Sequence, residues 1–265
     1  MPVLKRKLIA IDMDGTLLSQ NYSLSRFSVG FLSALSKQGH ILVLSSGRPP
    51  RSMMGTYAKL SCFGPLICYN GAHVFSPNDP SFPALKQVFS RAEVASVCKA
   101  LSPLLDGYQA EGEKEILRHN TFHELDAFFP EKGMRIKDGE LSPEGEDLYS
   151  VVFKEKARND DAFSSILSAY PDLSWRHWTD SPFFELHLPS VSKGNALSFV
   201  MDALGIKKED SFAFGDSDND FEMLSRVGHP FAMKNSKSVR LLSSFPRTEK
   251  GNSEDGVAFE LKKYF

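Results

Sequence analysis

Two aspartates separated by one residue directly follow a short apolar run near the amino terminus. Residues 8–11 are apolar, Asp12 and Asp14 come next, and a glycine and a threonine complete the stretch. Carboxylates this close repel each other, and the usual compensation is a bound cation or a proton held by one of the pair. Asp and Gly are also common turn residues. Taken alone, the stretch is therefore either a reactive carboxylate pair or a turn that ends a strand.

Further polar groups stand at the ends of other apolar runs. They are Ser46, Gly47 and Arg48 at the end of residues 40–46, Asp216, Asp218, Asn219 and Asp220 at the end of residues 211–216, and Lys193 at the start of a predicted helix. Ligands of open α/β sheets bind outside the carboxyl ends of the strands. If the apolar runs are strands of one such sheet, we expect these side chains to converge on one crevice.

This set of residue types favours phosphoryl transfer. Clustered carboxylates without His or Cys suit Mg²⁺, which binds a few carboxylates together with substrate phosphate. An aspartate beside Mg²⁺ can attack a phosphate ester as a nucleophile, and a second carboxylate can move the protons. The phosphoryl oxygens would need donors, and the backbone N–H groups after Asp12, the Ser46 hydroxyl, the Gly47 amide and the Lys193 ammonium can supply them.

The elements that must position these groups alternate between strand and helix. Apolar runs predict strands, and apolar positions at helical spacing predict helices. The predicted strands are residues 7–12, 40–46, 65–69, 211–216 and 229–233, and the predicted helices are residues 24–38, 51–61, 192–205, 219–228 and 253–265. Residues 70–71 predict a tight turn into a hairpin. Buried strands that alternate with helices indicate a parallel sheet covered on both faces.

The pattern changes in the middle of the chain. From residue 76 a Pro- and Ser-rich stretch reads as a linker, and residues 84–188 hold shorter strands, two predicted helices and more charge. The first pattern returns at residue 192. We therefore expect an α/β core formed by residues 1–82 and 189–265, with residues 83–188 inserted as an α+β domain.

Bulk composition narrows the class of protein. The 265 residues carry a net charge of −2, and 42% of them are hydrophobic. These values are typical of a globular protein, and the absence of a basic stripe argues against nucleic acid as a partner. The first apolar run is too short for a signal peptide or a membrane span. Three cysteines without metal-type spacing predict reduced thiols and a cytoplasmic protein.

Four short stretches, in order, resemble the motifs of the haloacid dehalogenase-like phosphatase superfamily. They are DMDGT at 12–16, SSG at 45–47, SKG at 192–194 and GDSDND at 215–220. Further matches resemble the Cof-type subgroup: YNGA at 69–72, KGNAL at 193–197, FGDSDNDFEML at 214–224, AMKNS at 232–236 and NSEDGVA at 252–258. The resemblance implies a Rossmann-like core with an inserted α/β cap that closes over the site and selects the substrate.

The resemblance also implies a role for each matching residue. Asp12 would be the phosphoryl-accepting nucleophile and a Mg²⁺ ligand, and Asp14 the general acid and base, with its backbone carbonyl on the metal. Ser46 and Lys193 would bind the phosphoryl group, with Gly15, Gly47, Arg48, Asn70 and Asn219 as further phosphate- or substrate-binding candidates. Asp216 would bind Mg²⁺, and Asp220 would support the metal shell through water or Lys193.

Several residues keep an alternative interpretation. Arg48 either reaches phosphate or pairs with a neighbouring acid, and Asn70 is either a ligand or only a turn residue. Lys193 alone would be an ordinary helix-start lysine, and residues 215–220 alone could be a calcium-type loop or a helix cap. The paired phenylalanines at 128–129 and 183–184 favour the core of the inserted domain over a substrate pocket. Glu185 and His187 share a strand face and favour a structural role over a place in the cleft.

The expected activity is Mg²⁺-dependent hydrolysis of small phosphorylated metabolites, with sugar phosphates favoured, by a monomer or homodimer. A sugar phosphomutase is the first alternative, because it would use the same aspartyl-phosphate and return the phosphate to a sugar. A non-catalytic phospho-acceptor is the second. Such a protein needs the nucleophile, the metal and the lysine but no neighbouring acid, so Asp14 argues against it.

Overall fold

The computed structural model of the protein describes residues 6–120, 123–178 and 181–265. Two compact units make up the chain: unit 1 comprises Met1–Leu85 and Ser192–Phe265, and unit 2 comprises Lys86–Val191. The chain thus leaves unit 1 once and returns to it once. Across the described residues, no helix combines the length and apolarity that crossing a membrane requires.

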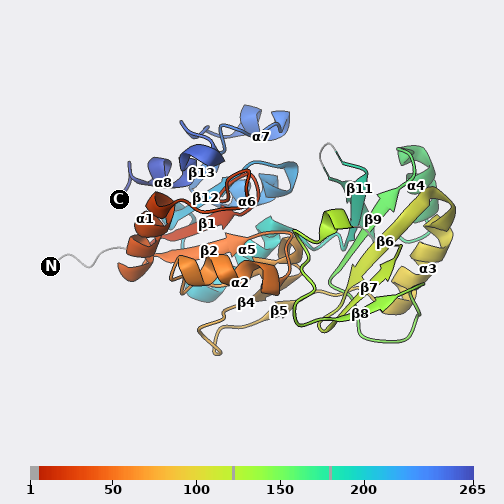
Figure 1. Ribbon diagram of the computed structural model, residues 1–265. Helices are drawn as coiled ribbons and strands as arrows, with labels where there is room; N and C mark the ends of the chain where they lie inside the picture. Colours follow the sequence, from red (N-terminus) through yellow and green to blue (C-terminus); the bar gives the residue numbers. More distant parts are fainter. Residues whose placement is uncertain (1–5, 121–122, 179–180) are drawn as a thin grey trace. The chain divides into compact units, whose positions relative to one another are not determined.

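Unit 1 is built on a seven-stranded sheet (Figure 1). Its strands are β1 (Leu8–Asp12), β2 (Ile41–Ser45), β3 (Leu66–Cys68), β4 (His73–Phe75), β5 (Leu85–Lys86), β12 (Ser211–Gly215) and β13 (His229–Ala232). They lie in the order β13-β12-β1-β2-β3-β4-β5. The first five in this order are parallel, and β4 runs antiparallel to β3. Every residue of β1, β2 and β12 is buried, as expected for strands covered on both faces.

Helices cover both faces of this sheet. They are α1 (Arg26–Lys37), α2 (Pro50–Lys59), α5 (Lys193–Leu204), α6 (Phe221–Arg226), α7 (Val239–Ser244) and α8 (Gly256–Leu261). Leu8 and Ala10 of β1 pack in one cluster with residues of α5, α6 and α7. Ile9 and Ile11 point to the opposite face because side chains alternate along a strand, and there α1 contacts β2 and α8.

The parallel strands bring their carboxyl ends to one edge of the sheet. In the pairing register, Asp12 at the end of β1 lies opposite Ser45 of β2, and Ile11 lies opposite Phe214 of β12. The N-cap of α5 is Ser192, whose Oγ accepts a hydrogen bond from the backbone N–H of Asn195 at 3.1 Å. This cap makes Lys193 the first residue of the helix.

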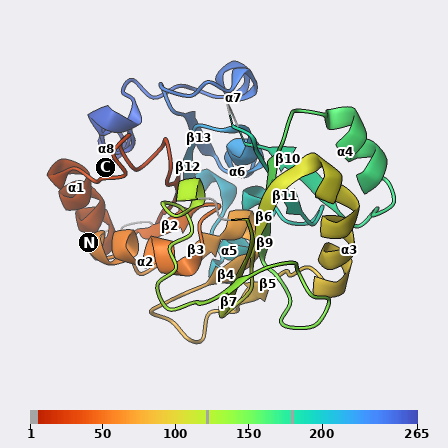
Figure 2. The same cartoon turned by 45° about the vertical axis from the view of Figure 1, so that its right-hand side comes forward.

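Unit 2 contains a six-stranded sheet with α3 (Arg91–Leu101) and α4 (Asp160–Leu167) on the same face (Figure 2). The strands are β6 (Leu105–Glu111), β7 (Glu115–His119), β8 (Arg135–Asp138), β9 (Ser150–Glu155), β10 (Ser174–His177) and β11 (Phe183–His187). Their order is β10-β11-β9-β6-β7-β8, with only the β7–β8 pair parallel.

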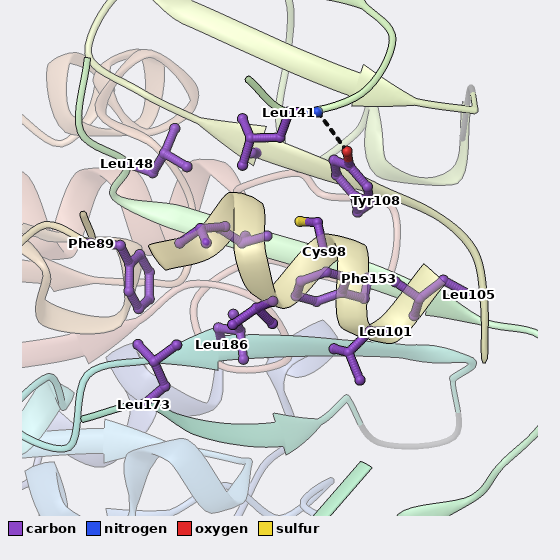
Figure 3. Close-up of a cluster of buried hydrophobic side chains, with 14 of the residues drawn as sticks. Phe89, Cys98, Leu101, Leu105, Tyr108, Leu141, Leu148, Phe153, Leu173 and Leu186 are labelled. Carbon is purple, nitrogen blue, oxygen red and sulfur yellow. Dashed lines mark hydrogen bonds between the residues drawn. The ribbon is translucent and has the colours of Figure 1, made fainter. Parts of the chain in front are cut away.

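An apolar cluster of described residues joins the helices of unit 2 to its sheet (Figure 3). Phe184 belongs to it and stacks on Phe153 with ring centroids 4.9 Å apart. Phe128, Phe129 and Phe183 instead gather around Trp178. Glu185 forms an ion pair with Arg176 of the neighbouring strand.

The predicted elements differ from the observed ones mainly at their ends and near the carboxyl terminus. The helix expected over 253–265 divides into a 3₁₀ turn, η6 (Asn252–Glu254), and α8, because Asp255 between them has a left-handed φ of 61°. The short helix α7 was not predicted. It begins where Ser238 Oγ accepts a hydrogen bond from the N–H of Leu241, and its six residues are too few to show a helical period in the sequence.

Candidate active site

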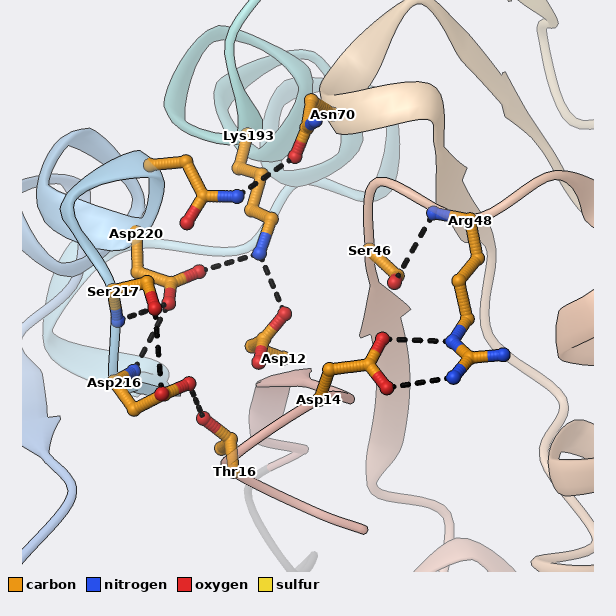
Figure 4. Close-up of polar contacts among 11 residues, drawn as sticks. Asp12, Asp14, Thr16, Ser46, Arg48, Asn70, Lys193, Asp216, Ser217 and Asp220 are labelled. Carbon is orange, nitrogen blue, oxygen red and sulfur yellow. Dashed lines mark hydrogen bonds and ion pairs between the residues drawn. The ribbon is translucent and has the colours of Figure 1, made fainter. Parts of the chain in front are cut away.

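The carboxyl ends of β1, β2 and β12 and the start of α5 bring the predicted polar residues of unit 1 together (Figure 4). The polar residues are Asp12, Asp14, Ser46, Arg48, Asn70, Lys193, Asp216, Asn219 and Asp220. The predicted glycines, Gly15 and Gly47, lie against Asp216 and Asn70. Two further 3₁₀ turns contribute, η1 (Tyr69–Gly71) after β3 and η5 (Asp218–Asp220) after β12.

Lys193 lies at the centre of the site. Its Nζ donates hydrogen bonds to Oδ1 of Asp12 and Oδ1 of Asp220, each at 2.6 Å, and the residue is only 1% exposed. Burial by itself lowers the pKa of Lys193, but the two carboxylates outweigh it and raise the pKa above its usual value. Lys193 is therefore a permanent buried cation between Asp12 and Asp220.

One lysine does not compensate the carboxylates around it. Burial raises the pKa of Asp12 well above its usual value, Lys193 opposes this shift, and Asp220, Asp216 and Asp14 add to it. Burial and the neighbouring Asp220 also raise the pKa of Asp216, to about 6. The site thus has an excess of negative charge, which a further cation would relieve.

Hydrogen bonds fix the loop after β12. The Oγ1 of Thr16 donates to Asp216 Oδ1 at 3.0 Å, and so links this loop to the one after β1. The backbone N–H groups of Asp216 and Ser217 donate to Asp220 Oδ2 at 3.0 and 3.1 Å. Asp220 therefore accepts bonds on both of its oxygens, from Lys193 and from its own loop.

Three carboxylates lie close enough together to hold a metal ion. Asp12, Asp216 and Asp220 each offer one oxygen, and these three oxygens lie within 4.8 Å of one another. The possible metal ligands are all carboxylate oxygens. Hard cations such as Mg²⁺ prefer oxygen ligands, whereas softer metals prefer nitrogen or sulfur. The residues present therefore fit a hard divalent cation.

Gly15 brings the two loops into close approach. Its φ is +81°, and a Cβ at this position would lie 2.3 Å from Oδ2 of Asp216. Any other residue would be strained at this φ and would displace the Asp216 carboxylate. Gly15 thus acts through the space that it leaves for Asp216.

Asp14 points to a different partner from Asp12. Arg48 donates from Nε to Asp14 Oδ2 and from Nη2 to Asp14 Oδ1, both at 2.7 Å. A third donor, Nη1, reaches Ser52 Oγ at 2.8 Å. The Tyr22 ring lies 5.4 Å from the guanidinium. Of the two interpretations of Arg48, the ion pair with an acid is present, and a contact with phosphate stays a prediction.

The loop after β2 and the turn after β3 contribute the remaining residues of the site, Ser46 and Asn70. Ser46 is buried, and its Oγ accepts the N–H of Arg48 at 3.2 Å. Asn219 Nδ2 donates to Oδ1 of Asn70 at 2.9 Å, whereas the buried Oδ1 of Asn219 has no hydrogen-bond partner among the described residues. Asn70 has a left-handed φ of 56°, so it is also the turn residue of the alternative interpretation.

No role was predicted from the sequence for five residues whose hydrogen bonds hold the loops of the site: Thr16, Ser217, Asn235, Ser236 and Asn252. Each lies within a motif quoted above, and that position was the signal in the sequence that could have pointed to it. Their contacts, which join segments distant in sequence, were not visible in it.

Comparisons with known proteins show a family and several relatives to which this chain is similar. The sequence pattern of a family described as haloacid dehalogenase-like hydrolase matches residues 9–261. The 5-amino-6-(5-phospho-D-ribitylamino)uracil phosphatase YitU of Bacillus subtilis is 32% identical over an alignment of 276 positions that covers 98% of each chain. A protein of Escherichia coli with the same activity in its name, YbjI, is 26% identical and covers 94% of this chain and 92% of its own.

Solved structures share the fold. A haloacid dehalogenase-like hydrolase from Bacteroides thetaiotaomicron superposes with a TM-score of 0.80 at 24% identity, covering 98% of this chain and 100% of its own. A sugar phosphatase of haloacid dehalogenase subclass IIB has a TM-score of 0.79 at 19% identity, with 97% and 98% of the two chains covered.

Proposed function

Because the chain belongs to the haloacid dehalogenase-like hydrolase family and is a phosphatase, we propose that it is a Mg²⁺-dependent phosphomonoesterase that carries the phosphoryl group on Asp12. One observation carries this proposal. The buried Asp12 carboxylate lies within a group of three acidic residues and is bound by Lys193 at 2.6 Å. A nucleophile, a site for a cation and a fixed positive charge are the groups that attack on a phosphate dianion requires.

We assign the metal site to Asp12 and Asp216, with the backbone carbonyl of Asp14. Asp220 is the weaker candidate for a direct ligand, because Lys193 and two backbone N–H groups already bind its oxygens. Asp220 would support the site by holding Lys193 and the loop that bears Asp216. When bound, Mg²⁺ would offset the negative charge of the carboxylates and of the substrate phosphate.

In the first step, a carboxylate oxygen of Asp12 attacks phosphorus and the bond from phosphorus to the ester oxygen breaks. Asp14 donates a proton to the departing alkoxide. Lys193 and the Ser46 hydroxyl stabilise the charge on the transferring phosphoryl oxygens. The products of this step are the alcohol and an aspartyl-phosphate on Asp12.

In the second step, Asp14 accepts a proton from water, and the water oxygen attacks phosphorus. The bond from phosphorus to Asp12 breaks, and inorganic phosphate and the Asp12 carboxylate are restored. Arg48 holds the Asp14 side chain in a fixed orientation for this step, because its guanidinium donates to both carboxylate oxygens. Over the cycle one water is consumed for each ester cleaved.

The substrate that we propose is a phosphate ester of a sugar or sugar alcohol. Two relatives, in Bacillus subtilis and Escherichia coli, are named for 5-amino-6-(5-phospho-D-ribitylamino)uracil, whose phosphate is on a ribityl chain. This compound is therefore the first member of a test panel, followed by hexose and pentose phosphates.

The test is phosphate release from p-nitrophenyl phosphate and from this panel. We expect turnover with Mg²⁺, loss of turnover on chelation, and none in Asp12→Asn. The control Asp202→Asn changes an exposed carboxylate on α5 and should match the wild type. Turnover by Asp12→Asn would contradict the proposal. Conversion of glucose 1-phosphate to the 6-phosphate without phosphate release would favour the phosphomutase instead.

A further inference from the structure

Two segments with family-like sequence, 232–236 and 252–258, have no part in the chemistry above, yet both reach the loop that follows Asp12. Asn235 Nδ2 donates to the backbone carbonyl of Gly15 at 2.7 Å. Asn252 Nδ2 donates to the backbone carbonyl of Leu18 at 2.8 Å. The backbone N–H of Asn252 donates to Asn235 Oδ1, also at 2.8 Å. The two asparagines thus form one connected unit against the loop.

The residue after Asn235 reaches the second loop of the site. Ser236 Oγ donates to the backbone carbonyl of Asp216 at 2.6 Å. Consecutive side chains therefore bind the carbonyl of Gly15, in the loop after β1, and that of Asp216, in the loop after β12. We call Asn235, Ser236 and Asn252 the loop brace.

The loop after β1 needs such support because of its backbone. Its internal backbone hydrogen bonds run from the N–H of Leu17 to the carbonyls of Asp12 and Met13, at 3.2 and 3.1 Å, and from the N–H of Leu18 to the carbonyl of Met13, at 2.8 Å. Between these ends lies Gly15, with a φ of +81° that glycine adopts and leaves at little cost. A bond to the Gly15 carbonyl fixes the plane of the peptide that follows it, and so limits how far Asp14 and Gly15 can shift relative to Asp216.

We propose that Asn235 and Asn252 are positioning residues, which hold the turn bearing Asp14 and Gly15 in the geometry needed for phosphoryl transfer. The proposal rests on the proposed function, since it assigns the brace to that same site. Neither asparagine contacts the reacting carboxylates. Their effect is on the loop backbone, and through it on the direction of the Asp14 side chain and carbonyl.

The test compares Asn235→Ala and Asn252→Ala with two control variants of exposed neighbours, Lys234→Ala and Ser253→Ala. We expect each asparagine variant to lower kcat by about 10- to 100-fold, the usual effect of losing a partner that orients a site residue. KM should change by less than about twofold, because substrate binding is not the interaction removed. The controls should match the wild type.

A third variant separates positioning from general stability. Asn235→Asp keeps the size of the side chain and the acceptor for the N–H of Asn252, but it replaces the donor to Gly15 with a repelling oxygen. We expect it to be at least as impaired in kcat as Asn235→Ala. Activity equal to the wild type in Asn235→Asp would overturn the proposal.

Hydrogen exchange of residues 13–18 and calorimetric binding of Mg²⁺ give readouts that do not need turnover. Both asparagine variants should exchange faster in this segment and bind Mg²⁺ more weakly, while the controls do neither. The wild type could lack phosphatase activity while the asparagine variants still exchange faster in residues 13–18. In that case the proposed function is wrong, but the loop brace does hold this loop. If the wild type is active and the variants match it in kcat and exchange, the brace fails alone.

Discussion

Arg48 binds both carboxylate oxygens of Asp14, at 2.7 Å each, and so holds the second aspartate of the site apart from Lys193 and the first. The Arg48 side chain is 7% exposed and the Asp14 side chain 29%. The two aspartates therefore have different surroundings although one residue separates them. Asp12 faces the buried ammonium group of Lys193. Asp14 is partly exposed and faces the planar guanidinium of Arg48, which donates to both of its oxygens. This division is in keeping with the separate roles that we propose, Asp12 as the nucleophile and Asp14 as the proton carrier.

Replacing Arg48 should impair proton transfer by Asp14 more than the attack of Asp12 on phosphorus. Arg48→Lys keeps the charge but loses the two-point geometry that orients Asp14. With a sugar phosphate, whose alkoxide needs a proton to leave, we expect kcat to fall by about 100-fold, the lower range for general acid catalysis. With p-nitrophenyl phosphate the fall should be smaller, because p-nitrophenolate leaves without a proton.

Steady-state kinetics on the two substrates measures this difference. The control is Arg26→Lys, at the exposed start of α1, which should leave both rates unchanged. Equal losses on the two substrates would show that Arg48 acts on a step common to both, such as phosphate binding.

Removing the buried lysine should destabilise the protein. Lys193→Met leaves Asp12 and Asp220 buried without their cation, and breaking a buried ion pair in this way costs about 3–5 kcal/mol. Urea unfolding at neutral pH measures the loss, with the exposed Lys207→Met as control. The loss should shrink at lower pH, because burial raises the pKa of Asp12 and the folded variant then takes up a proton there. A loss independent of pH would contradict the electrostatic explanation.

The stabilising effect of Mg²⁺ should increase with pH. The pKa of Asp216 is raised from 3.8 to about 6, so the folded protein retains a proton there that the unfolded chain has released. The stability that this proton provides without metal is present below 3.8 and is lost as the pH rises through about 6. Above that pH the ionised carboxylate is free to bind Mg²⁺.

Thermal unfolding with and without Mg²⁺ tests this dependence. The rise in Tm on adding Mg²⁺ should be larger at about pH 7.5 than at about pH 5, where protons compete for the same oxygens. Asp216→Asn should remove most of the rise at both values. A rise that is equal at the two pH values would argue against binding at Asp216.

The positions of the main carboxylates and of the lysine follow from local rules. A short apolar run that ends in Asp12 predicts a buried strand with its carboxylate at the carboxyl edge, and Ser192 is a strong N-cap that makes Lys193 the first helical residue. These rules act over a few residues. They also explain the parallel core strands β1, β2 and β12.

Contacts between distant segments do not follow from such rules. Arg48 has a long side chain that could reach either phosphate or an acid, and only the folded structure selects Asp14. The bond between Asn219 and Asn70 joins residues 149 positions apart. The brace from Asn235 to Gly15 spans 220 positions. Pairings of this kind depend on how loops from separate strands meet, which neither periodicity nor capping specifies.

Local backbone conformation limited the prediction at the carboxyl terminus. Residues 253–265 have helical spacing, but Asp255 takes the left-handed conformation and its Oδ1 accepts from Ser28 at 2.7 Å. A tertiary contact thus outweighs helix propensity at that residue.

The most direct test of the account is the site of phosphorylation in Asp14→Asn. This variant keeps the nucleophile and Lys193 but lacks the group that activates water, so it should form the phosphorylated protein and hydrolyse it slowly. After rapid mixing with p-nitrophenyl phosphate and Mg²⁺ and an acid quench, intact-mass spectrometry with fragmentation should find one phosphoryl group, on Asp12. A phosphoryl group on another residue, or continued turnover with none on the protein, would contradict the central claim.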